Sequence, residues 1–119
     1  MSLADRVRAD VHWFLAAYVR AIDLTKIWVE AAAFDPKVSE IRTQMRAPLI
    51  TRIRRGVEMA APPGVDPEVA AVALAAMTEQ FGYLWFVEGL GPGTDDKAVD
   101  NAADTIARLW LNSIGVADA

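Results

Sequence analysis

His12 is the only histidine in this sequence, and there is no cysteine. Catalysis by a nucleophile needs a base beside it, and metal binding needs three or four converging ligands. No serine stands at a plausible relay spacing from His12, and the lack of cysteine excludes disulfides, thiolate metal sites and thiol chemistry. We therefore interpret His12 as a structural residue and predict a protein that is not an enzyme, with no catalytic residues, no metal site and no cofactor.

Two other groups resemble functional motifs only superficially. Asp100 and Asp104 lie one helical turn apart, but a dimetal carboxylate site needs Glu-x-x-His pairs on facing helices, and these are missing. Gly89, Gly91 and Gly93 follow an expected helix rather than a strand, and no Gly-Lys-Ser/Thr comes after them. We expect solvated carboxylates in the first case and a turn in the second.

Arginines and aromatic residues are the remaining candidates for binding. The spacing of the arginines spreads them around a helix, which favours a solvated face, with contact to an anionic ligand or interdomain ion pairs as alternatives. The aromatics either fill a core or, packed among many alanines, leave an apolar cavity for a small molecule. The arginines are Arg42, Arg46, Arg52, Arg54 and Arg55, and the aromatics are Trp13, Phe14, Tyr18, Trp28, Phe34, Phe81, Tyr83, Trp85, Phe86 and Trp110.

The elements that would position these residues are helices. Residues that favour helix starts, two of them followed by proline, recur along the chain, and loops rich in Pro and Gly occupy residues 61–65 and 89–93. We expect one all-α domain over residues 1–119 with about five helices. They begin near Ser2, Asp23, Asp35, Asp66 and Thr94, the first two end near Ile22 and Phe34, and the last ends at Gly115.

The third expected helix carries an apolar stripe interrupted by a proline. Pro48 removes a backbone hydrogen bond, so it should kink this helix or divide it in two. The stripe consists of Val38, Ile41, Met45, Leu49, Ile53, Val57 and Ala60.

Residues 11–22 and 69–87 are apolar on nearly all sides, so we expect these two helices to be surrounded by the domain or by a partner chain. No apolar run approaches the ~18 residues of a membrane span, because Arg20, Glu30 and Glu79 interrupt the richest stretches. Residues 62–119 carry nine acidic and only two basic side chains, which would repel nucleic acid. We expect a cytoplasmic protein that associates with itself and binds no membrane.

Several segments resemble the C-terminal domain of TetR-family transcriptional regulators, from about Ala4 to Gly115. They are IWVEAA at residues 27–32 followed by DP at 35–36, a long arginine-rich helix, PGVDPEVAAVAL at 63–74, MTEQFGY at 77–83 and IARLWL at 106–111.

The resemblance implies a ligand-sensing and dimerisation domain of a repressor. Its last two long helices, residues 69–89 and 95–115, would form a four-helix bundle with a second copy. A small hydrophobic or aromatic effector would then release DNA in the full-length protein. The pocket residues would be Trp13, Phe14, Tyr18, Trp28, Met45, Leu49, Met77 and Phe81, and a polar end of the ligand could meet Arg20, Arg46 or His12.

The family's N-terminal DNA-binding domain has no counterpart in this sequence. Residues 1–61 contain no helix-turn-helix with a basic recognition helix, so we expect no DNA binding by this chain alone. Two alternatives remain. One is a helical protein-interaction module without a small-molecule pocket, and the other is a small helical enzyme.

Overall fold

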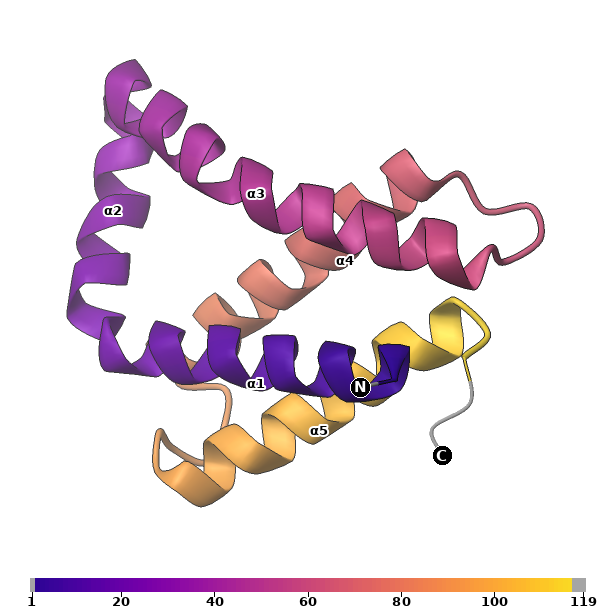
Figure 1. The fold of residues 1–119 in the computed structure, drawn as a ribbon. Helices are drawn as coiled ribbons and strands as arrows, with labels where there is room; N and C mark the ends of the chain where they lie inside the picture. The colour runs from indigo at the N-terminus through magenta and orange to yellow at the C-terminus, as the bar shows by residue number, and fades with distance from the viewer. Residues whose placement is uncertain (1, 117–119) are drawn as a thin grey trace.

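A computed structural model describes residues 2–116, and over these residues the fold is all-α with no strand (Figure 1). The predicted fold class and the expected five helices are confirmed. The elements are α1 (Leu3–Arg20), α2 (Ile22–Phe34), α3 (Pro36–Ala60), α4 (Pro67–Gly82), the π-helix η1 (Tyr83–Val87) and α5 (Asp96–Ser113).

Side-chain caps begin four of the five α-helices, as the sequence predicts. The Ser2 hydroxyl accepts a hydrogen bond from the Asp5 amide at 3.1 Å, and Asp35, Asp66 and Asp95 cap α3, α4 and α5 in the same way. Each cap satisfies an amide that the first helical turn leaves without a partner. The start of α2 differs.

The expectation that Asp23 caps α2 is wrong. The cap position is Ala21, whose amide bonds to the Ala17 carbonyl and whose carbonyl accepts from the Thr25 amide at 2.8 Å. These two bonds carry helical hydrogen bonding across the junction of α1 and α2. Asp23 therefore lies in the first turn of α2, where a negative charge still suits the helix dipole.

Gly115 ends α5 as expected. Its φ of 72° is in the left-handed region, its amide bonds to the Asn112 carbonyl, and the next amide, of Val116, bonds to the Leu111 carbonyl. This pair of bonds is a Schellman motif, which satisfies carbonyls at the end of the helix.

Helix α3 runs unbroken through Pro48, so a division in two is wrong. The apolar stripe behaves differently along its length, because only Ile53 and Val57 are buried while Ile41 and Met45 are exposed. The C-terminal half of α3 therefore joins the core, and the N-terminal half does not.

The core lies where α1 packs along α5 and α4 crosses behind them (Figure 1). Val11 and Leu15 of α1 and Leu111 of α5 are almost completely inaccessible to solvent. Helices α1, α2 and α3 form three sides of an open frame on the other side of the molecule (Figure 1). This frame carries the candidate site.

The chain itself does not surround the two apolar helices, so of the two expected ways of covering them only a partner chain remains. Trp13 of α1 is 67% exposed, and Val69 and Val72 of α4 are 67% and 50% exposed. In addition, residues Pro67–Val87 form one helix long and apolar enough to cross a membrane by length and composition, contrary to the expectation from sequence. The core helix of a soluble protein passes the same test but is mostly buried, whereas 33% of this window is buried, Leu74 and Ala75 included.

The π-helix η1 continues α4 with a wider turn. The ring of Trp85 stacks on Phe81 at a centroid distance of 5.5 Å and packs against Gly91, where a Cβ atom would lie only 2.5 Å from the Trp85 ring. Gly91 is therefore needed for the loop after η1 to return over this indole.

Candidate functional site

A cavity of about 430 Å³ opens between α1, α2 and α3 and reaches one residue of α4. Small-molecule sites in proteins fall in the same range of volume. Its walls consist of Asp10, Trp13, Phe14, Ala17 and Tyr18 of α1, Thr25 and Trp28 of α2, Arg42, Met45, Arg46, Leu49 and Arg52 of α3, and Glu79 of α4.

Helical periodicity explains why these side chains meet. The lining residues of α1 lie at positions 10, 13, 14, 17 and 18, and those of α3 at 42, 45, 46, 49 and 52. Steps of three and four residues place each set on one helix face. The apolar members of both sets make most of the wall, and the charged members gather toward Glu79 and Asp10.

Six of the eight pocket residues expected from the sequence line this cavity: Trp13, Phe14, Tyr18, Trp28, Met45 and Leu49. Met77 and Phe81 do not, which corrects their assignment. Both are partly buried against the core, and Phe81 packs on Trp85 and Phe86 instead.

The polar end of the cavity is an ion-pair cluster that joins α3 to α4. Arg46 donates to both carboxylate oxygens of Glu79 at 2.7 Å, and Arg42 adds a longer bond of 3.3 Å. The bidentate bond to Glu79 raises the pKa of Arg46 further above its usual value. Two guanidinium groups thus face one carboxylate, so the cluster carries a positive charge overall.

Tyr18 stands beside this cluster with its phenol half-buried. Burial, followed by the negative charge of Glu79, raises the pKa of Tyr18 to about 12. Its ring packs on α4 at Gly82, where a Cβ atom would lie 3.4 Å from three ring atoms. Tyr18 is therefore a neutral hydrogen-bonding group at the cavity wall near neutral pH.

The three residues suggested for the polar end of a ligand have different positions. Arg46 lines the cavity, whereas His12 and Arg20 do not. The His12 Nε2 atom lies 2.6 Å from Asp100 Oδ1 of α5, and both side chains are about half exposed. Asp100 is thus a hydrogen-bond partner of His12 rather than a freely solvated carboxylate.

Sequence reasoning missed Asp10, Ala17, Thr25 and Glu79 as lining residues, and it placed Arg42 and Arg52 mainly on a solvated face. Glu79 did carry a signal, because it is the only charged residue between Val69 and Val87. A lone carboxylate in such a helix needs a cationic partner, and α3 was the arginine-rich candidate.

A second cavity of about 230 Å³ lies next to the first, between α1, the C-terminal half of α3, α4 and α5. The two cavities share four wall residues, Asp10, Phe14, Leu49 and Arg52. They are neighbouring cavities along α1 and α3.

Comparisons of the chain with protein-family models, with curated proteins and with solved structures return no significant match.

Proposed function

We propose that this chain is the ligand-sensing and dimerisation domain of a TetR-type transcriptional repressor, and that its effector is a small, mainly hydrophobic molecule. The observation that carries the proposal is the cavity between α1, α2 and α3, with its aromatic walls and two groups of charged side chains, one at Glu79 and one at Asp10. Sites of this kind combine apolar walls with a few polar groups that orient the ligand. A tightly interlocked set of aromatic side chains would instead have favoured the protein-interaction module.

An exposed apolar face on α4 supports the dimerisation part of the proposal. Val69, Val72, Ala73 and Ala76 are all exposed and recur at three- and four-residue steps, so they share one helix face. The alanines would allow a second helix to approach closely. On α5, Leu109 is the one large apolar side chain that is exposed, at 49%. We propose that these residues meet their counterparts in a second copy of the chain.

Light scattering after size exclusion tests the dimer. At about ten micromolar protein we expect twice the chain mass of 13.0 kDa, with an isologous interface on the order of 1,200 Å² or more. Val72→Glu should give monomers because it places a charge in the apolar face. The matched control is Ile27→Glu on α2, which is similarly exposed and should leave the dimer intact. A monomeric parent chain would contradict the proposal.

Native mass spectrometry of freshly purified protein tests the ligand. We expect a small-molecule adduct on the folded dimer that is released on denaturation and is weakened by Trp28→Ala, which removes part of the cavity wall.

In the repressor proposed, DNA affinity belongs to a separate domain. Fluorescence anisotropy with duplex DNA at physiological salt should therefore show only weak, salt-sensitive association. A nanomolar, sequence-dependent complex would contradict that assignment.

A further inference from the structure

We propose that the effector is an elongated amphiphile with one carboxylate, whose tail passes from the wide cavity into the narrow one beneath the Asp10–Arg52 ion pair. This inference rests on the proposed function, because it names the class of ligand that the same cavities would take. Four observations carry it.

The first observation is that the two cavities are adjacent and share wall residues. Phe14 of α1 and Leu49 of α3 line both, so a ligand that covers these two side chains reaches into both cavities. A compact aromatic molecule would occupy only the wide cavity. The arrangement of the two cavities therefore favours a long, flexible ligand.

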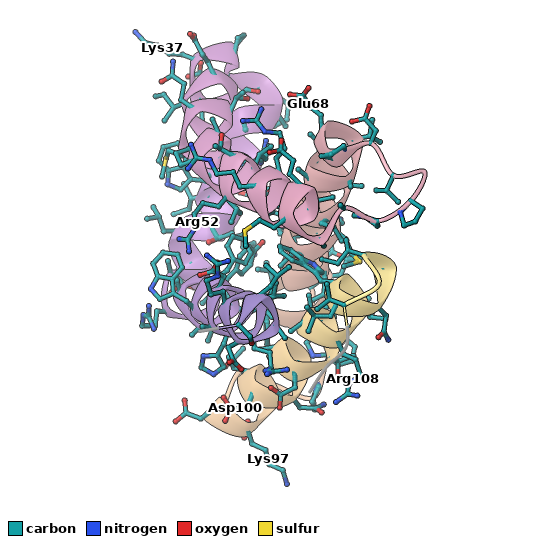
Figure 2. All side chains as sticks on the ribbon, turned by 45° about the vertical axis from the view of Figure 1, so that its right-hand side comes forward. Lys37, Arg52, Glu68, Lys97, Asp100 and Arg108 are labelled. Atoms are coloured by element: carbon teal, nitrogen blue, oxygen red, sulfur yellow. The ribbon has the colours of Figure 1, made fainter. Side chains whose placement is uncertain are left out.

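The second observation is the ion pair above this junction. One guanidinium nitrogen of Arg52 donates to both carboxylate oxygens of Asp10, at 2.8 and 2.9 Å, which links α3 to α1. Figure 2 shows Arg52 in the space between these two helices. The Arg52 side chain is 63% exposed, so the link can open at little cost in free energy. The Asp10–Arg52 ion pair can therefore break to admit the alkyl tail of the ligand and re-form over it.

The third observation is the charge of the lining. Five arginines line the two cavities, against only the carboxylates of Asp10 and Glu79, although the whole chain has a net charge of −4. The arginines are Arg6, Arg42, Arg46, Arg52 and Arg55. This excess of positive charge in an acidic protein favours an anionic ligand. The carboxylate would sit against Arg42 and Arg46, which share a single carboxylate partner in the free protein.

The fourth observation is the character of the narrow cavity at its inner end. Its polar wall atoms already have partners, because Trp110 Nε1 donates to the Thr78 hydroxyl at 3.0 Å and that hydroxyl donates to the Leu74 carbonyl at 2.9 Å. The remaining inner wall is aliphatic, with Val57 and Ile114 among its residues. This end of the cavity has no free hydrogen-bonding atom for a polar group of the ligand, so it suits an alkyl tail.

The test is a chain-length series followed by tryptophan fluorescence. The probes are octanoate, decanoate and dodecanoate below their critical micelle concentrations, and dodecanol is the uncharged analogue of the same chain length as dodecanoate. If the tail enters the narrow cavity, the Kd should fall roughly fourfold per added methylene through dodecanoate. Dodecanol should bind roughly tenfold more weakly than dodecanoate, because it lacks the charge that the arginines recognise. Arg46→Gln should remove most of this difference.

A variant that fills the narrow cavity tests the path of the tail. Gly56 lines that cavity, and a Cβ atom there would lie 3.6 Å from Leu3, an ordinary contact, so Gly56→Leu would place its outer atoms in the tail space. We expect dodecanoate to bind Gly56→Leu no more tightly than octanoate does. Ala47→Leu adds the same side chain at an exposed position of α3 outside both cavities and should leave the series unchanged. Melting curves establish that each variant is folded.

The outcomes separate this inference from the proposed function. Binding of a naphthalene-type aromatic probe with no dependence on chain length or charge would overturn the inference and leave the ligand-sensing proposal standing. Binding of neither the carboxylates nor the aromatic probe would count against both. In that case a partner helix would be the better candidate for the cavities.

Discussion

Helices α5 and α2 differ in burial although both are rich in apolar residues. Eight residues of α5 are buried, whereas none of the residues of α2, all of which the structure describes, is buried. In α5, Ala102, Ala103 and Ala107 allow α1 and its neighbours to approach closely. At the α2 corner Trp13 and Trp28 line a cavity instead of packing into the core.

This difference indicates that the two regions have different roles. The side formed by α1, α4 and α5 contains nearly all of the buried core, so the stability of the domain depends mainly on it. The corner formed by α2 and the N-terminal half of α3 contains no buried residue, so we expect it to open at low cost in free energy. A ligand in the cavity would supply the missing apolar contacts.

The largest expected difference is between truncations on the two sides. Leu111→Ala removes a side chain with no solvent exposure and should lower the free energy of unfolding by about 3–4 kcal/mol. Trp13→Ala removes a larger side chain that is 67% exposed at the cavity wall, so without ligand it should cost less than about 1 kcal/mol. Urea denaturation measures both, and equal losses would contradict the division into two regions.

A smaller effect is expected at the ion pairs. Glu79→Gln leaves Arg42 and Arg46, each less than a third exposed, without their carboxylate and should cost about 2 kcal/mol. Asp100→Asn is the matched control, since it removes a carboxylate that hydrogen-bonds to His12 where both side chains are about half exposed or more, and it should change stability little. Thermal unfolding at low and high salt distinguishes the two. A Glu79→Gln protein as stable as Asp100→Asn would show that the cluster does not hold α3 to α4.

The smallest effect concerns Tyr18. Its pKa is raised to about 12 from the usual tyrosine value of 10.0, so the folded state holds the phenolic proton more tightly than the unfolded chain does. Its contribution to stability is therefore complete below pH 10 and is lost as the pH rises from about 10 to about 12. Because the phenol is half-buried, screening reduces this loss to about 1 kcal/mol. Stability measured across this pH range should fall less for Tyr18→Phe than for the parent chain, and identical slopes would contradict the assignment.

Features set by a few neighbouring residues could be predicted from the sequence. The caps at Ser2, Asp35 and Asp66 depend on one side chain and the amides two or three positions later, so their sequence pattern is sufficient. Asp23 failed as a cap because the backbone bonds at Ala21 leave the helical pattern almost uninterrupted, which no local side chain reveals.

Features that depend on tertiary packing were predicted in part. Trp13, Tyr18 and Trp28 reach the cavity because their helices bear aromatic residues on the face that turns inward. Helix α4 is apolar on most sides, so periodicity could not decide which of its faces meets the cavity, and Met77 and Phe81 were misplaced for that reason. The Arg46–Glu79 pair joins residues that are 33 positions apart, and it depends on how α3 crosses α4.

Amide hydrogen exchange compares the opening of the two regions residue by residue. In the free protein, we expect amides of α2 and of the N-terminal half of α3 to exchange much faster than those of α5. Saturating dodecanoate, or the aromatic probe if that is what binds, should slow exchange at α2 while leaving α5 nearly unchanged. Equal protection of α2 and α5 in the free protein, unaltered by either probe, would contradict the claim that a ligand completes this half of the domain.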